Sequence, residues 1–277
     1  MTIRLGHIDY SNCVPVHALL LAHAPAGLEL VRGTPAEVNA ALAVGAIDAA
    51  PCSSIEYARH LGRYRMLPAH AIGSRGAVRS IRLETTRPLE ELEGARVAVP
   101  SASATSVVLL RALLELRLGV RPRLEWFEQS PAADPIAEGA AAALRIGDIA
   151  LARRVPRGRT AVDLGALWTE WTGLPFAFAV WQVRSGMRDH ELRRLIRLLA
   201  DSREFYRHHR AELARQHAPA AGVPPDVLLD YWDSLHFDLD AAMQRGLLHF
   251  FALAAQLGDA PLVTALDIVR LEPEPVG

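Results

Sequence analysis

The sequence contains no lysine, and all 30 of its basic residues are arginine. Catalysis through a Schiff base, including that of pyridoxal-phosphate enzymes, needs a lysine, and so does the Walker type of phosphate-binding loop. The absence of lysine therefore excludes these classes. It leaves open a site that holds anions through hydroxyl groups, amides and backbone N–H groups.

Cysteines are few and apolar runs are short. Cys13 and Cys52 are the only cysteines, and their spacing matches no zinc site. In a reducing cytosol we expect both to be buried free thiols. No segment reaches the roughly 20 uninterrupted apolar residues that a membrane helix needs, and the first residues do not resemble a secretory signal. We therefore expect a cytoplasmic protein with no metal site and no membrane contact.

The charge balance and the missing motifs restrict partners and cofactors. The net charge is −1 at pH 7, which argues against a nucleic-acid partner. The sequence has neither a GxGxxG fingerprint nor an HExxH pair, so nothing indicates a dinucleotide cofactor or a zinc hydrolase. We expect no cofactor and a small-molecule ligand, and the oligomeric state is left open.

The order of the elements predicts an α/β protein with two lobes. Strand and helix patterns alternate, a crossover follows, a second βαβ set comes next, and the chain then returns to end in helices. This order implies one lobe made of residues 1–85 plus 176–277 and another made of 86–175, with the ligand cleft between them. The expected elements include a strand over 73–83, a helix over 137–143, and terminal helices over 189–214, 224–236 and 238–257.

Polar turns follow several of the expected strands. The alternating strand 3–8 runs into Tyr10, Ser11 and Asn12 before an apolar helix. Ligands of open α/β sheets bind outside the carboxyl edge of the strands. We therefore predict that Tyr10 and Asn12 face the cleft, and that the later turns join them there. The later turns contribute Ser53, Ser54, Ser74 and Asp148.

A further polar turn opens a long apolar helix. Ser103, Thr105 and Ser106 stand between a strand and the helix expected over 107–118. Free N–H groups and the positive end of the helix dipole favour an anion at such a helix start, and the hydroxyls add donors. The turns together predict a neutral, donor-rich pocket for a small dianion held by Tyr10, Ser53, Ser54, Ser103, Thr105, Ser106 and Asp148.

Several of these segments resemble the chorismate dehydratases of the futalosine route to menaquinone, the MqnA family of the MqnA/MqnD group. The matching segments occur in family order and span nearly the whole chain. They are GHIDYSNCVP (6–15), GAID (45–48), SSIEY (53–57), SRGAVRSI (74–81), SATS (103–106), IGDIAL (146–151), DLGALW (163–168), TGLPFAFA (172–179) and YWDSLHFDL (231–239).

The resemblance implies a periplasmic-binding-protein-like fold of type II and the loss of water from chorismate, which gives 3-[(1-carboxyvinyl)oxy]benzoate. We assign catalytic roles to Asn12 and Ser74, which would orient the substrate and bind its leaving hydroxyl or enolpyruvyl group. The base is either the enolpyruvyl carboxylate of the substrate, Asp148 or a histidine. Two alternative functions are a 1,4-dihydroxy-6-naphthoate synthase-like lyase and a cytosolic protein that binds small anions.

Overall fold

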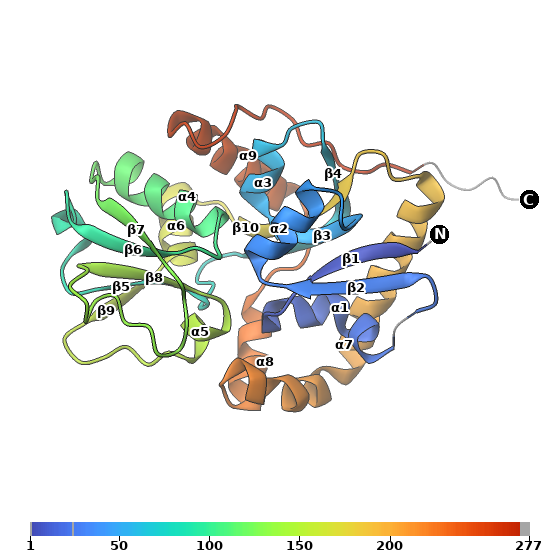
Figure 1. The fold of residues 1–277 in the computed structure, drawn as a ribbon, viewed down its shortest axis with the longest axis horizontal. Coiled ribbons are helices and arrows are strands. Elements are labelled where there is room, and N and C mark those ends of the chain that lie inside the picture. The colour runs from blue at the N-terminus through green and yellow to red at the C-terminus, as the bar shows by residue number, and fades with distance from the viewer. Residues whose placement is uncertain (1, 24, 272–277) are drawn as a thin grey trace, which may run out of the picture.

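The protein forms two lobes that lie side by side, each built around a five-stranded sheet (Figure 1). The computed structural model describes residues 2–23 and 25–271. The end of the first predicted lobe, residues 272–277, lies outside the described residues.

The sheet of the first lobe has the order β2-β1-β3-β10-β4. β1 pairs in parallel with β2 and β3, whereas β10 runs antiparallel to β3 and β4. The parallel strands therefore share one carboxyl edge, which faces the second lobe (Figure 1). The strands are β1 (Ile3–Ile8), β2 (Leu28–Gly33), β3 (Ala49–Ser53), β4 (Tyr64–Ser74) and β10 (Phe176–Arg184).

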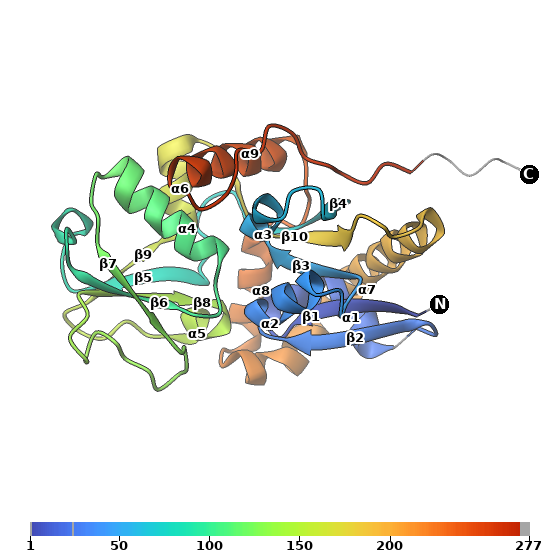
Figure 2. The same cartoon turned by 45° about the horizontal axis from the view of Figure 1, so that its top comes forward.

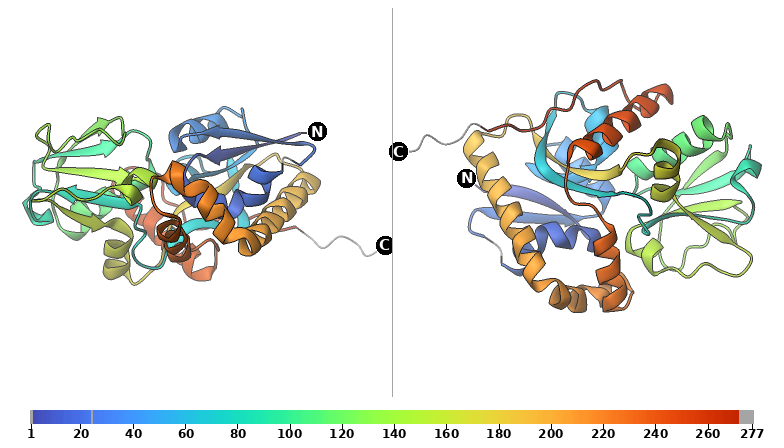
Figure 3. Two further views of the ribbon diagram at one scale, coloured as in Figure 1. Left: turned by 90° about the horizontal axis from the view of Figure 1, so that it is seen from below. Right: turned by 180° about the vertical axis from the view of Figure 1, so that it is seen from behind.

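Helices cover both faces of this sheet (Figures 2 and 3). They are the 3₁₀ turn η1 (Ser11–Cys13), α1 (Val14–Ala22), α2 (Pro35–Ala43), α3 (Ser54–Arg59), α7 (Asp189–Ala221), α8 (Pro225–Ser234) and α9 (Ala241–Gln256). Thr34 and Glu37 form the capping box that starts α2. Although α7 has 33 residues, no helix in 2–23 or 25–271 combines the length and apolar character needed to span a membrane.

The second lobe has a sheet of order β7-β6-β8-β5-β9. β6 pairs in parallel with β7 and β8, and β5 runs antiparallel to β8 and β9. Its strands are β5 (Ile81–Thr85), β6 (Arg96–Pro100), β7 (Arg123–Phe127), β8 (Ala142–Ile146) and β9 (Thr160–Asp163). Its helical segments are η2 (Leu89–Glu91), α4 (Thr105–Arg111), the π-helical η3 (Ala112–Arg117), α5 (Gly147–Ala152) and α6 (Leu164–Thr172).

Two segments connect the lobes. The first lies between the end of β4 at Ser74 and the start of β5 at Ile81, where Arg79 takes a φ of +66°. The single strand predicted over 73–83 is therefore interrupted. Residues 81–85, which the sequence assigned to the first lobe, pair with β8 and β9 in the second sheet. The return segment runs from α6 to the start of β10 at Phe176.

The helix predicted over 137–143 is wrong. Residues 135–139 form turns, and β8 starts at Ala142. Ala142 and Ala143 are fully buried between β5 and β6. Alanine is the strongest helix former, but its intrinsic preference is worth less than about 1 kcal/mol per residue, so burial in the centre of a sheet overrides it.

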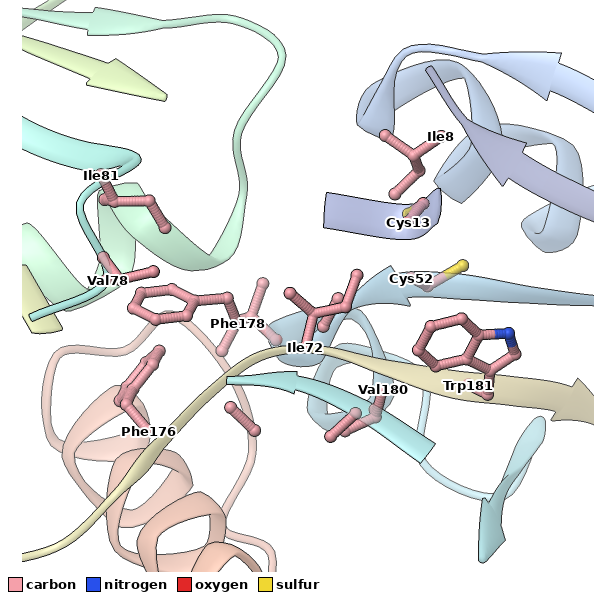
Figure 4. Close-up of a cluster of buried hydrophobic side chains, with 14 of the residues drawn as sticks. Ile8, Cys13, Cys52, Ile72, Val78, Ile81, Phe176, Phe178, Val180 and Trp181 are labelled. Carbon is pink, nitrogen blue, oxygen red and sulfur yellow. The ribbon is translucent and has the colours of Figure 1, made fainter. Parts of the chain in front are cut away.

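An apolar cluster connects the lobes beneath the cleft (Figure 4). Val78 and Ile81 come from the first connection, and Phe176 and Phe178 come from the return strand. They continue into the core of the first lobe around Ile72 (Figure 4). Because both connections are anchored in one buried cluster, the floor of the cleft is fixed in position.

Candidate functional site

A small cavity of about 70 Å³ lies between the lobes. The end of β1, the end of β3, the first connection, the start of α4 and the start of α5 all contribute to it. Its polar lining residues are Tyr10, Asn12, Ser53, Ser80, Ser103, Thr105 and Ser106, and its apolar ones include Ile8, Ile72, Ile81 and Ile146. Among the described residues that line it, none is acidic, basic or a histidine. The cavity is therefore polar but uncharged.

Six of the nine residues predicted for the site line this one cavity. They are Tyr10, Asn12, Ser53, Ser103, Thr105 and Ser106. Each lies at the end of a strand, in the turn that follows it or in the first turn of the next helix, so the carboxyl edges of two different sheets bring them together.

Two of the predicted residues, Ser54 and Ser74, do not line this cavity. The Ser54 hydroxyl donates to the carbonyl of Ala177 over 2.6 Å and ties α3 to β10. The Ser74 hydroxyl donates to the carbonyl of Gly76 over 2.8 Å, within the first connection. Both hydroxyl protons are therefore used inside the protein.

Asp148 also lies outside the cavity and links the two lobes instead. Its carboxylate accepts from the Ser11 hydroxyl at 2.5 Å and from the Ser11 N–H at 3.0 Å. Burial raises the pKa of the Asp148 carboxyl above its ordinary value, and the two bonds from Ser11 partly oppose that shift. We call this contact the Ser11–Asp148 latch, because it joins η1 of one lobe to α5 of the other.

Tyr10 closes the cavity beside the latch. Its ring lies against Gly147, where a Cβ atom would come within 2.8 Å of the ring carbons. Gly147 also has a φ of +62°, which favours glycine. Burial, with a smaller effect of Asp148, raises the pKa of the Tyr10 phenol to about 12. Tyr10 therefore acts as a neutral wall of the cavity.

The first turn of α4 carries the hydroxyls of the second lobe. Ser103, Thr105 and Ser106 are all buried. The Thr105 hydroxyl oxygen accepts from the Ile55 N–H across the cleft at 3.2 Å, so its proton stays available to a ligand. The first N–H groups of a helix have no partner within the helix, and its dipole favours an anion there. This wall of the cavity suits a carboxylate.

Sequence reasoning missed three residues around Asn12. Ser80 lines the cavity, and Tyr231 donates its phenol proton to the Ser80 hydroxyl at 2.8 Å. Trp232 donates its indole N–H to the carbonyl of Ser11 at 2.8 Å. All three lie in segments that carry the family resemblance, but no local pattern shows that α8 reaches the turn after β1.

The lobes are in contact around the cavity. Besides the Ser11–Asp148 latch, the Ile55–Thr105 bond crosses between them. Pockets for small organic ligands generally measure about 300–1,000 Å³, far more than the 70 Å³ present here. A ligand of that size therefore needs the lobes to separate before it can enter.

Metal binding has no geometric basis in the described part of the chain. No three His, Cys, Asp or Glu side chains within residues 2–23 and 25–271 are grouped so that they could hold an ion. Cys13 and Cys52 are buried free thiols whose pKa values burial raises.

The two sheets, the two connections and the cavity between the lobes define a periplasmic-binding-protein-like α/β fold. The aliphatic sulphonate binding protein SsuA of Escherichia coli superposes with a TM-score of 0.67 at 15% identity, over 100% of this chain and 95% of that one. A protein of Archaeoglobus fulgidus gives a TM-score of 0.78 at 17% identity, over 93% and 98% of the two chains. At such identities the similarity establishes the fold alone.

The chain belongs to the menaquinone biosynthesis family, whose model matches residues 3–256. The chorismate dehydratase of Thermus thermophilus is 32% identical over 274 residues, which cover 93% of this chain and 97% of that protein. The chorismate dehydratase of Campylobacter jejuni is 31% identical over 179 residues, covering 63% and 64%.

Proposed function

We propose that this protein is a chorismate dehydratase, a hydro-lyase that removes water from chorismate for menaquinone biosynthesis. Family membership and the relative from Thermus thermophilus support the activity. The observation that carries the chemistry is the uncharged, hydroxyl-rich cavity between the lobes. Chorismate is a dianion with a hydroxyl group, so donors without charge can bind it while leaving its own carboxylate free to react.

The ring carboxylate of chorismate would bind at the start of α4. Ser103, Thr105 and Ser106 supply hydroxyl donors there, next to the positive end of the helix. Loss of the C3 proton places negative charge on the ring and its carboxylate. Donors preorganised around that carboxylate stabilise the charge as it develops, as an oxyanion hole does.

The base is best supplied by the substrate. No residue that lines the cavity in the described chain has an ionisable group other than the Tyr10 phenol, and the pKa of that phenol is about 12. The Asp148 carboxylate lies outside the cavity and accepts two hydrogen bonds from Ser11. We therefore assign removal of the C3 proton to the enolpyruvyl carboxylate, which is held next to it by covalent geometry.

The reaction then balances without a further reactant. The C3 proton passes to the enolpyruvyl carboxylate, and the C3–H electron pair enters the ring as the C4–O bond breaks. The departing hydroxide takes the proton back from the enolpyruvic acid and leaves as water. The product is the aromatic 3-[(1-carboxyvinyl)oxy]benzoate, and aromatisation makes the step strongly downhill.

An ultraviolet assay tests this proposal. Incubating the purified protein with chorismate is expected to replace the cyclohexadiene absorption by that of a benzoate, with the product identified by mass spectrometry. Calorimetric binding of chorismate without turnover would instead indicate the anion-binding alternative. A naphthoate synthase-like lyase would need a larger and more aromatic pocket than this cavity. Among the described residues that line the cavity, Tyr10 is the only one with an aromatic ring.

The Ser11–Asp148 latch leads to a separate prediction. Asp148→Asn and Ser11→Ala both weaken this contact, so both are expected to raise KM for chorismate about tenfold. A hydrogen bond to a charged group is worth about 1.5–3 kcal/mol, and a latch of that strength shifts the population of closed lobes. Steady-state kinetics measure KM, and small-angle X-ray scattering is expected to show a larger radius of gyration in both variants.

The pair of variants also separates a latch from a base. Ser11→Ala leaves the Asp148 carboxylate in place, so similar effects of the two substitutions support the latch. If Asp148→Asn abolishes kcat and Ser11→Ala does not, the carboxylate of Asp148 removes the proton and the assignment of the base to the substrate is wrong.

A further inference from the structure

A chain of hydrogen bonds lies directly beneath the cavity and connects two of its lining residues. Tyr231, on α8, is fully buried. Its phenol oxygen bonds to the Ser80 hydroxyl at 2.8 Å and also interacts with the Asn12 side chain. Asn12 and Ser80 both line the cavity. Tyr231 therefore touches the floor of the site from behind without contacting the ligand space.

The protons in this chain point in one direction. The Asn12 Oδ1 atom is buried without a partner in the described structure, so the amide group of Asn12 meets Tyr231 through its Nδ2 donor. The single proton of the Tyr231 phenol then goes to Ser80. A serine hydroxyl carries one proton, and that of Ser80 is left to point into the cavity.

Further contacts fix Asn12 and Ser80, the two ends of this chain of hydrogen bonds. On one side, Trp232 follows Tyr231 on α8 and donates to the carbonyl of Ser11, which fixes the turn that carries Asn12. On the other side, Asp163 accepts from the N–H groups of Val78 and Arg79 at 3.0 and 2.6 Å. These bonds hold Arg79 at its φ of +66° and so place Ser80.

We propose that Tyr231 is a positioning residue, which holds the Asn12 oxygen and the Ser80 proton toward the cavity so that together they bind one hydroxyl group of the substrate. Asn12 Nδ2 and Ser80 Oγ both contact the same phenol oxygen, so they lie within about 6 Å of each other, and Asn12 Oδ1 belongs to the same amide group as Nδ2. One hydroxyl can therefore bridge Asn12 Oδ1 and Ser80 Oγ. Its proton goes to Asn12 Oδ1 and its lone pair accepts from Ser80 Oγ. This inference rests on the proposed function, in which that hydroxyl is the leaving group of chorismate.

The arrangement assists departure of the hydroxyl. As the C4–O bond breaks, negative charge grows on the leaving oxygen, and the proton of Ser80 faces it. A hydrogen-bond chain that runs from Asn12 through Tyr231 to Ser80 polarises its last hydroxyl, which strengthens that donor. The remaining lone pair of the leaving oxygen is free to accept the proton from the enolpyruvic acid.

Tyr231→Phe tests the proposal, because it keeps the ring and removes only the oxygen. We expect kcat for chorismate to fall at least tenfold while KM changes less than threefold. In an Asn12→Ala background the same substitution is expected to cost less activity than it does in the wild-type protein, because part of its effect acts through Asn12. Independent losses that multiply in the double variant would overturn the proposal, as would an unchanged kcat in Tyr231→Phe alone.

Two other variants test whether a loss of kcat comes from a loss of folding. Tyr57→Phe removes another buried phenol oxygen, which accepts from the Asp267 N–H at 2.7 Å and does not line the cavity. It is expected to lower stability and keep kcat. Ser80→Ala removes the donor at the other end of these contacts, so it is expected to lower kcat, and to cost less in the Tyr231→Phe background than in the wild-type protein. A loss of kcat in Tyr57→Phe as large as that in Tyr231→Phe would overturn a positioning role.

A binding comparison keeps the inference separate from the proposed function. The product 3-[(1-carboxyvinyl)oxy]benzoate has no C4 hydroxyl, so Tyr231→Phe is expected to leave its dissociation constant unchanged within twofold. If the wild-type protein binds chorismate without converting it, the proposed activity fails, but Tyr231→Phe is still expected to weaken chorismate binding by about threefold and product binding not at all. Equal weakening of both ligands would overturn the positioning role.

Discussion

Asn12→Ala is expected to lower kcat for chorismate about a hundredfold while the protein stays folded. Asn12 lies in η1 and presents a buried, unpartnered Oδ1 atom at the cavity. Removing that acceptor frees the leaving hydroxyl to rotate, and misplacement of a reacting group by about 1 Å can cost about 10²-fold in rate. Initial rates followed by ultraviolet absorption give kcat, and circular dichroism reports the fold.

Two variants sharpen this test. Asn12→Asp keeps an oxygen acceptor, but it removes the donor to Tyr231 and adds a negative charge beside a dianion, so its kcat is also expected to fall. Ser202→Ala removes another buried hydroxyl, which accepts from the Leu19 N–H, and is expected to retain activity. Wild-type kcat in both Asn12 variants would refute the role of Asn12.

Acidification from pH 7.5 to 5 is expected to destabilise the protein by about 2 kcal/mol for each of two buried histidines. Burial lowers the pKa of His7 and of His70 to about 4, from an ordinary 6.5. The unfolded chain therefore takes up protons before the folded protein does. Their contribution to stability is complete above about pH 6.5 and is lost as the pH falls toward 4.

The hydrogen bonds around His17 explain why the His7 and His17 rings stay neutral. Trp181 donates its indole N–H to His17 Nε2 at 3.1 Å, so His17 carries its proton on Nδ1 and directs it at His7 Nδ1, 2.9 Å away. His7 is left with its proton on Nε2, facing Asp9 at 3.8 Å. A second proton on His17 or His7 would place two N–H groups against each other.

The charged neighbours shift the His7 and His70 pKa values less than burial does. Asp9 raises the pKa of His7, whereas Arg32 and His217 lower it. For His70, Arg203 lowers the pKa and Asp238 raises it. The net direction for both rings is downward, because burial is the largest cause.

Urea unfolding followed by tryptophan fluorescence at pH 7.5 and pH 5 measures this effect. His70→Gln removes one titrating ring and is expected to reduce the pH-dependent loss by about 2 kcal/mol. His208→Gln, at an exposed position of α7, is expected to leave the loss unchanged. An equal free energy of unfolding of the wild-type protein at the two pH values would contradict the prediction.

The polar turns at the ends of strands could be predicted because they depend on residues close together in the chain. A strand, a short turn with Tyr10 and Asn12, and a helix identify a sheet edge from local pattern alone, and the same holds for Ser53 and for the turn before α4. Which hydroxyl is free to bind a ligand could not be predicted in this way. The Ser54 proton is taken by the carbonyl of Ala177, which only the folded chain brings near, and the Ser74 proton is taken by the carbonyl of Gly76 within its own turn.

Local pattern also failed where burial outweighs propensity. The alanines at 142 and 143 form a central strand because their backbone pairs with β5 and β6 and both side chains are fully buried, which outweighs the helix preference of alanine. Strand pairing also decides the boundary between the lobes. The sequence assigned residues 81–85 to the first lobe, but Ile81–Thr85 pairs with strands of the second sheet.

Composition and short-range order were thus sufficient to exclude lysine chemistry, to predict two α/β lobes and to place Asn12 at a sheet edge. The latch between Ser11 and Asp148 and the contact of Tyr231 with Ser80 required the folded protein. Their partners are 137 and 151 residues apart in the chain, and a hydrogen bond forms only when its two atoms are brought within about 3 Å.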